Sequence, residues 1–90
     1  MLRKEIKLSN KLGLHLRAAS KLSQLATAFS SDILISTGAK KNINAKSVLG
    51  ITMLAAGYKT KVSVEVRGPD EELALDAIIN LFEDKFGENE

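Results

Sequence analysis

The chain has 90 residues, of which 44% are hydrophobic and 27% are charged, and its formal net charge at pH 7 is +2. A chain of this length supports one hydrophobic core, so we expect a single domain over residues 1–90. The small net charge gives no reason to expect binding to nucleic acid or to an anionic membrane. The lack of cysteine excludes a disulfide framework and a thiolate metal site.

The first 29 residues predict a strand followed by a helix. In residues 2–8, Ile6 and Leu8 alternate with charged residues, which is typical of a strand with one solvated face. From Leu16 to Phe29, apolar residues recur every three or four positions, which predicts an amphipathic helix. Its buried side is expected to carry Ala18, Ala19, Leu22, Leu25, Ala26 and Phe29, and its outer side Lys21, Ser23, Gln24 and Thr27.

The middle of the chain predicts two strands and a short helix. Residues 30–37 read as a strand, a turn follows at Gly38, and residues 40–44 form a short returning strand. A helix then begins after Ser47, a favoured N-cap residue, and stops at Gly57, a favoured residue just past a helix end.

The last third predicts a strand and a long helix. Val62, Val64 and Val66 alternate with polar residues within 61–68 and indicate the fourth strand. Pro69 is expected to open the final helix, whose first turn carries three acidic residues. Its core face includes Ala74, Ala77, Ile78 and Leu81, and the segment FGENE at 86–90 is expected to fray. Four short strands with one apolar face, covered by helices, indicate an α+β two-layer sandwich in the order β-α-β-β-α-β-α.

The sequence shows no pattern typical of a signal peptide or of a membrane-spanning segment. The segment MLRKEIKLSN is charged and has no apolar core, so it does not read as a signal peptide. No apolar stretch approaches the roughly 20 residues that cross a bilayer. We therefore expect a cytoplasmic protein without membrane insertion. The single histidine has no carboxylate near it in sequence, so we expect no metal and no cofactor.

His15, the only histidine, is the candidate chemical centre. It lies at the start of the first predicted helix, where free backbone N–H groups and the helix dipole favour an anion. Arg17 adds a fixed charge whose fork geometry suits phosphate oxygens. Because imidazole can accept a phosphoryl group covalently and pass it on, these residues indicate a reversible phosphohistidine. The alternative, left open by the residues alone, is an ordinary surface or capping histidine.

The second helix carries two further predictions. Ser47 is expected to cap it, because a serine oxygen accepts a hydrogen bond from the first helical turn. The apolar residues of this short helix cannot all face the sheet, so some should form an exposed patch of the kind that binds a partner. The alternative is that loops cover them. The apolar residues in question are Val48, Leu49, Ile51, Met53 and Leu54.

Two separated motifs, GLHLRAA at 13–19 and NAKSVLGI at 44–51, resemble the histidine-containing phosphocarrier (HPr) family of the bacterial phosphoenolpyruvate-dependent phosphotransferase system. The resemblance covers nearly the whole chain. It implies an open-faced β-sandwich, in which three helices cover one face of a four-stranded antiparallel sheet. It also implies that His15 accepts a phosphoryl group on Nδ1 from phosphorylated Enzyme I, that Arg17 neutralises this group, and that an EIIA-type protein receives it.

The resemblance further implies how the chain meets its partners. Docking is expected at Leu16, Ser20, Gln24, Val48, Leu49 and Ile51. Ser47 resembles the serine that an HPr kinase/phosphorylase modifies, and a phosphate there would add a charge beside the docking residues. The chain would be a covalent carrier and a monomer, not a turnover enzyme, because it is itself the substrate of both transfer steps.

Ala18 departs from the pattern of many sugar-branch members, which have proline there. The form GLHLRA looks more like the nitrogen-related NPr branch, so both sugar uptake and regulatory signalling stay open. A different class of function is a purely regulatory protein-binding module controlled by phosphorylation of Ser47. Such a module would need neither His15 nor Arg17, which ranks it below the carrier. An RNA-binding function finds little support, because the chain lacks the basic and aromatic surface motif that such a domain needs.

Overall fold

The structure is a computed structural model that describes residues 1–89, and it contains one four-stranded antiparallel sheet. The strands are β1 (Leu2–Lys7), β2 (Asp32–Ser36), β3 (Ile43–Asn44) and β4 (Lys61–Arg67), in the spatial order β1-β4-β2-β3. The helices are α1 (Leu16–Thr27), α2 (Val48–Met53) and α3 (Glu71–Glu83), and a short turn of 3-10 type, η1 (Lys85–Gly87), follows α3. The predicted α+β class and the predicted order of elements are confirmed.

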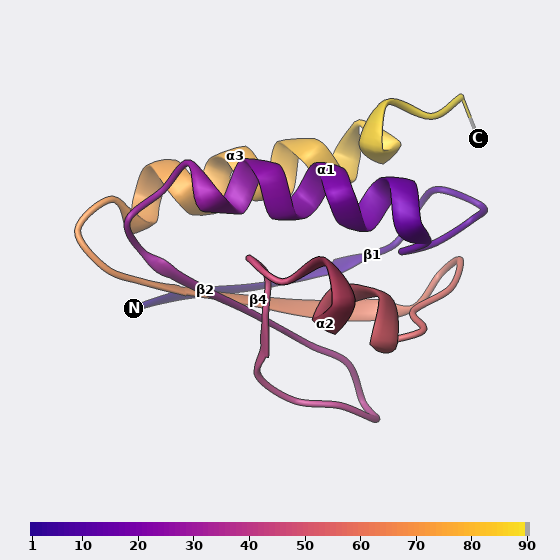
Figure 1. The fold of residues 1–90 in the computed structure, drawn as a ribbon, viewed down its shortest axis with the longest axis horizontal. Coiled ribbons are helices and arrows are strands. Elements are labelled where there is room, and N and C mark those ends of the chain that lie inside the picture. Colours follow the sequence, from indigo (N-terminus) through magenta and orange to yellow (C-terminus); the bar gives the residue numbers. More distant parts are fainter. Residues whose placement is uncertain (90) are drawn as a thin grey trace.

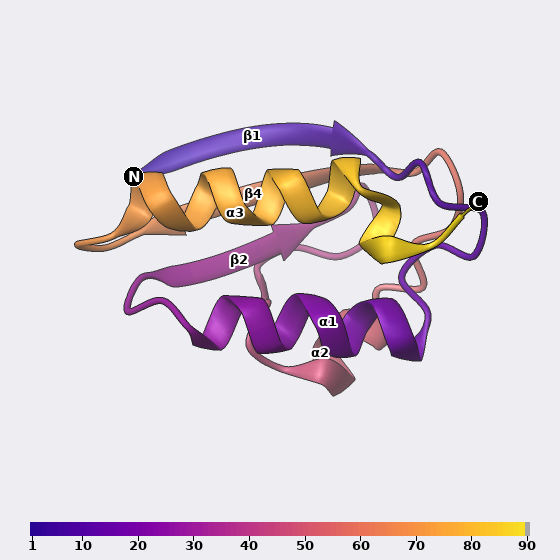
Figure 2. The ribbon, with the colours of Figure 1, turned by 90° about the horizontal axis from the view of Figure 1, so that it is seen from above.

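The helices and the sheet form two layers with the core between them. Figure 1 shows α1 and α3 lying over the strands, and Figure 2 shows the same helices from above. The alternation in β4 turns Val62, Val64 and Val66 toward the helices, where each is fully buried. The short helix α2 packs against α1 at the β3 edge of the sheet. Within residues 1–89, no helix is long and apolar enough to cross a membrane.

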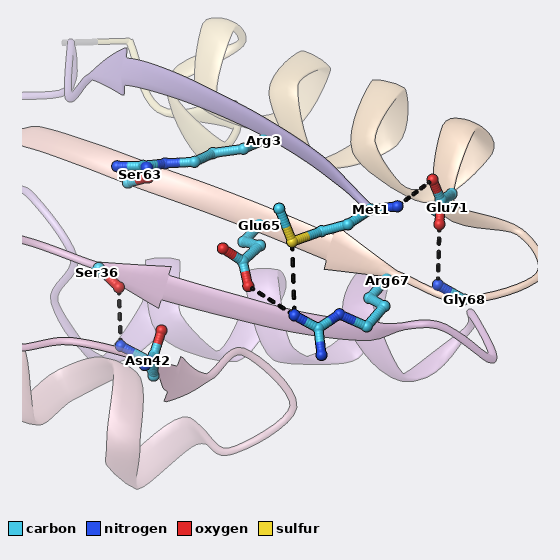
Figure 3. A network of polar contacts seen from close by, with 9 residues as sticks. All are labelled: Met1, Arg3, Ser36, Asn42, Ser63, Glu65, Arg67, Gly68 and Glu71. Carbon is cyan, nitrogen blue, oxygen red and sulfur yellow. Dashed lines mark hydrogen bonds and ion pairs between the residues drawn. The ribbon is translucent and has the colours of Figure 1, made fainter.

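The other face of the sheet is polar and solvated. Arg3 of β1 donates from Nε to Ser63 Oγ of β4 at 2.8 Å, and Arg67 Nη2 lies 3.6 Å from Glu65 Oε2 (Figure 3). The hollow on this face, about 460 Å³, is lined by polar and charged side chains together with Gly38. These contacts explain how the open face stays in water while the valines of β4 face the core.

The start of β1 is tied to the start of α3. The Met1 ammonium lies 3.1 Å from Glu71 Oε2, and the other oxygen of Glu71 accepts from the Gly68 N–H at 3.1 Å (Figure 3). Helix α3 begins at Glu71, slightly after the predicted opening at Pro69. Asp70, which precedes it, accepts hydrogen bonds from the N–H groups of Ser30 and Ser31 and so joins α3 to the segment after α1.

Two sequence predictions about the helices are wrong. Helix α2 ends at Met53 instead of continuing toward Gly57, and Ala55 adopts the left-handed backbone (φ 52°) that was expected of the glycine. Ser23 is buried instead of lying on the outer side of α1, because its hydroxyl donates to the Lys46 carbonyl at 2.9 Å. A polar residue facing α2 thus finds a partner that helical periodicity alone does not reveal.

The C-terminal segment is packed against the domain as far as Glu88, so the prediction that it frays is wrong for residues 86–88. Residue 90, to which the prediction also extended, lies outside the described residues. Phe86 is fully buried, and its ring centroid lies 5.0 Å from that of Phe82 on α3. Lys85, Phe86 and Gly87 all have left-handed backbone, with φ of 54°, 56° and 76°. This conformation costs a non-glycine residue about 1–2 kcal/mol. Burial of the Phe86 ring contributes about 2–3 kcal/mol, which offsets most of the combined cost at Lys85 and Phe86.

Replacing Phe86 with alanine tests whether the C-terminal segment belongs to the core. We expect Phe86→Ala to lower the free energy of unfolding by about 3 kcal/mol, because it leaves a cavity beside Phe82. Urea denaturation followed by circular dichroism measures this change. Leu73→Ala on the exposed face of α3 is the control and should cost less than about 0.5 kcal/mol. Equal small losses in both variants would contradict a packed C-terminal segment.

Candidate functional site

His15 stands at the N-cap of α1, with extended backbone (φ −72°, ψ 177°). The first hydrogen bond of the helix runs from the Ala19 N–H to the His15 carbonyl at 2.8 Å. The N–H groups of Leu16, Arg17 and Ala18 therefore have no acceptor carbonyl within the helix, and they form the positive end of its dipole. The predicted location of His15 at the start of the first helix is confirmed.

The loop before His15 is held by a close backbone contact. Gly13 has left-handed backbone (φ +67°), and a Cβ built on it would lie 2.4 Å from the Ala56 carbonyl oxygen. The next residue, Leu14, donates its N–H to the same Ala56 oxygen at 2.9 Å and is buried. Only glycine fits such a contact. The connection between α2 and β4 thus sets where the backbone of His15 enters the helix.

The ring of His15 is held by the other end of the chain. Its Nε2 lies 2.5 Å from Glu88 Oε2, and the exposed fractions of the two side chains are 27% and 10%. The other oxygen of Glu88 accepts from Asn10 Nδ2 at 3.0 Å. The same Asn10 nitrogen donates to the Gly13 carbonyl at 2.8 Å, so one buried amide joins the loop to the tail.

This arrangement keeps the Glu88 carboxyl ionised. Burial acts to raise its pKa, but hydrogen bonds from Asn10 and His15 act against it. The charge of Arg17 adds to the lowering, and the pKa of Glu88 lies below its ordinary value. An ionised carboxylate only accepts hydrogen bonds, which identifies the donors as Asn10 Nδ2 and His15 Nε2.

Basic side chains surround the tail beside His15. Lys11, Arg17 and Lys21 contribute to the lining of an open depression of about 570 Å³, whose far side is formed by the tail. Lys21 Nζ donates to the Phe86 carbonyl at 2.6 Å and so holds the turn that leads to Glu88. The positive charge of this region suits a phosphate group or an acidic partner. Residues 1–89 contain no group of three or more His, Cys, Asp or Glu side chains that could hold a metal ion.

Ser47 caps α2 as predicted. Its backbone is extended (φ −108°, ψ 112°), and its hydroxyl oxygen accepts from the Gly50 N–H at 3.1 Å. The preceding residue, Lys46, reaches back and donates from Nζ to the Phe29 carbonyl after α1 at 2.9 Å. Together with the bond from Ser23 to the Lys46 carbonyl, this contact fixes the start of α2 against α1.

The expected docking residues divide into exposed and buried ones. Leu16 and Leu49 are 67% and 70% exposed, Gln24 is exposed, and Ser20 and Val48 are half-buried. The inclusion of Ile51 is wrong, because its side chain is fully buried and belongs to the core. Helix α2 turns Leu49 and Met53, four residues apart, to solvent and Ile51 inward. Met53 was expected in the apolar patch of this helix but not among the docking residues. The other large exposed apolar side chains outside the docking set are Met1, Leu12, Tyr58 and Leu73.

Sequence reasoning also missed the residues that hold the imidazole. Asn10 lies in a polar loop where asparagine is common, and nothing in its neighbours marks it as buried. Glu88 lies 73 residues from His15 along the chain, in a segment with no periodic pattern. The one local signal was Phe86, a large aromatic residue placed after the last predicted helix.

Comparison with known proteins gives consistent results along the chain. The sequence model of the family described as "PTS HPr component phosphorylation site" matches residues 2–84. The chain is 46% identical over 90 residues to the phosphocarrier protein HPr of Cupriavidus necator, covering 100% of both proteins. It is 45% identical over 87 residues to the phosphocarrier protein NPr of Shewanella violacea, covering 97% of this chain and 94% of that protein.

A solved structure agrees in fold. The crystal structure of HPr-C-His from Thermoanaerobacter tengcongensis matches with a TM-score of 0.94 at 41% identity, and the match covers 100% of both chains. The open-faced sandwich that the resemblance implies is therefore confirmed. With the family match spanning all the main elements, the chain belongs to the HPr family of phosphotransferase-system phosphocarriers.

Proposed function

We propose that His15 takes a phosphoryl group from phosphorylated Enzyme I and passes it to an EIIA-type protein. The observation that carries this proposal is the placement of His15 at the N-cap of α1 with its ring held at Nε2 by Glu88. The ring then keeps its second nitrogen, Nδ1, for chemistry. Membership of the HPr family supports the carrier role, and the donor and acceptor are the partners that the family implies.

The transfer is a displacement at phosphorus. The Nδ1 lone pair of His15 forms a bond to phosphorus while the bond between phosphorus and the donor atom breaks, and that electron pair stays with the donor. The second step is the same displacement, with His15 now the leaving group. Catalysis rests on alignment and charge stabilisation, and Arg17 with the first N–H groups of α1 can supply the charge.

The partners would dock over the exposed apolar residues around His15. Leu16 at the start of α1 and Leu49 on α2 lie on helices that pack together, and both are largely exposed. Such a surface lets a partner exclude water from the transfer. We therefore propose Leu16, Ser20, Gln24, Val48 and Leu49 as docking residues, without Ile51. The chain acts as a monomeric cytoplasmic carrier and not as an enzyme with its own substrate pocket.

A complete relay assay tests this function. Phosphoenolpyruvate, purified Enzyme I, the chain and an EIIA-type acceptor of either the sugar or the nitrogen branch are combined, and acceptor phosphorylation is measured. We expect His15→Ala to abolish transfer and Arg17→Ala to slow it by about tenfold or more, because a phosphate-stabilising charge is lost. The branch whose acceptor is phosphorylated faster is the one that the chain serves.

The matched control for Arg17→Ala is Arg67→Ala, which removes the same charge from the solvated face of the sheet. Transfer through Arg67→Ala should equal that of the wild type. Equal slowing in the two arginine variants would contradict a local role for Arg17, and transfer that survives in His15→Ala would contradict the carrier proposal itself.

Ser47 is proposed as a regulatory phosphorylation site, the substrate of an HPr kinase/phosphorylase where the host has one. The half-buried Ser47 lies two residues before the exposed Leu49, so a phosphate on Ser47 would place charge beside the docking residues. The phosphate would have to be desolvated when a partner docks, and the free-energy cost of this desolvation opposes association. Because a phosphate is tolerated at a helix N-terminus, the domain itself should stay folded.

The variants Ser47→Asp and Ser47→Asn separate charge from capping, since both residues are good N-caps and only one is charged. We expect the Kd for Enzyme I, measured by calorimetry, to rise about tenfold in Ser47→Asp as an unfavourable charge enters the interface. Ser47→Asn should bind like the wild type. Wild-type affinity in Ser47→Asp would remove the proposed regulation.

A further inference from the structure

The C-terminal tail brings a carboxylate to one particular nitrogen of the His15 ring. Glu88 Oε2 contacts Nε2 at 2.5 Å, while Glu88 Oε1 accepts from Asn10. Because an ionised carboxylate only accepts, the proton in this contact lies on Nε2. In a neutral imidazole with a proton on Nε2, the other nitrogen, Nδ1, carries the free lone pair.

The tail is built so that Glu88 stays in place. Phe86 is fully buried against Phe82, and Lys21 holds its carbonyl from α1. Glu88 itself follows the turn directly, with its N–H donating to the Lys85 carbonyl at 2.9 Å. Its side chain is only 10% exposed, which is low for a glutamate one residue from the end of the described chain. A carboxylate held by so many contacts can orient the group it touches.

The proton on Nε2 matters for the chemistry at Nδ1. When the Nδ1 lone pair bonds to phosphorus, the ring gains a positive charge and keeps its Nε2 proton. A carboxylate already hydrogen-bonded to that proton stabilises the developing charge, as the aspartate does in a serine-histidine-aspartate triad. On the return step the charge is lost with the phosphoryl group, and the same hydrogen bond is left in place.

We propose that Glu88 is a positioning residue, which selects Nδ1 of His15 as the phosphoryl acceptor by holding the proton on Nε2. This inference rests on the proposed function, because it assigns a role within the transfer at His15. Asn10 supports it by fixing the second oxygen of the carboxylate and joining it to the loop before His15. Glu88 contacts Nε2 and not Nδ1. A group that blocked the reaction would instead contact Nδ1, the nitrogen that accepts the phosphoryl group.

Nitrogen NMR of selectively labelled His15 tests the assignment without any partner protein. With its imidazole neutral, the wild type should show one dominant tautomer, which has a protonated Nε2 and a pyridine-like Nδ1. In Glu88→Ala, which removes the acceptor, the two nitrogen shifts should move toward each other as the tautomers exchange. In Glu88→Gln, whose neutral amide oxygen still accepts but more weakly, the movement should be smaller. Glu83→Gln, which removes a carboxylate from an exposed position on α3, should leave both shifts unchanged.

Transfer kinetics and phosphate location complete the test. In both Glu88 variants we expect the rate of phosphorylation by Enzyme I to fall about tenfold, which is the lower end of the losses that follow removal of the hydrogen-bond partner of a metal-bound histidine. Phosphorus–nitrogen couplings should place the phosphate on Nδ1 alone in the wild type and partly on Nε2 in the variants. Circular dichroism spectra and thermal midpoints check that the variants are folded.

Unchanged nitrogen shifts in Glu88→Ala, which removes the acceptor from Nε2, overturn the proposal, whatever the rate does. Faster phosphorylation of the Glu88 variants also overturns it, since that result identifies a blocking contact. The same shift changes in Glu83→Gln would show a general charge effect and overturn it too. The failure of the proposed function looks different: the wild type itself would then accept no phosphate, while its nitrogen shifts still report on Glu88.

Discussion

His15 is placed by the meeting of three segments, which are the loop before α1, the connection at Ala56 and the C-terminal tail, and the site depends on this meeting. Gly13 brings the backbone against the loop at Ala56, and the N-cap places His15 at the positive end of α1. Glu88 then fixes the ring itself. Without the last contact, an imidazole on a helix N-cap could turn about its side-chain bonds, and either nitrogen could face an incoming group.

This dependence explains why the domain orders its C-terminal end. A tail of this kind is usually mobile, because the chain gains little from fixing a few polar residues. Here the buried ring of Phe86 offsets the cost of a left-handed turn, and Lys21 satisfies the carbonyl that the turn exposes. Core packing at one end of α3 is thus linked to the geometry of a reactive side chain at the start of α1.

The parts of the structure that the sequence predicts are those governed by local periodicity and capping. Alternating valines mark β4, the spacing of apolar residues marks α1, and Ser47 marks the start of α2. His15 and Arg17 could be chosen as candidates because few side chains combine nucleophilic and phosphate-binding chemistry. The resemblance of two motifs then identified the family and the fold.

The parts of the structure that the sequence does not predict depend on contacts between segments that are far apart in the chain. Ile51 shares the apolar character of Leu49, and only the three-dimensional path of α2 shows which one faces the core. Ser23 is buried because a carbonyl of another segment accepts its hydroxyl proton. Glu88 is one of several acidic residues near the C-terminus, and its role follows only from the turn before it. The left-handed backbone of Lys85 and Phe86 in that turn is not indicated by their residue types.

The central claim is that His15 carries the phosphoryl group, and mapping the phosphate on the intact chain tests it most directly. The chain is incubated with phosphoenolpyruvate and Enzyme I, digested under neutral or basic conditions, and analysed by mass spectrometry. We predict one phosphate, located on the peptide that contains His15, stable in base and lost in acid. A phosphate found only on Ser47 and stable in acid, or no phosphate with an Enzyme I from the same cell, would contradict the claim.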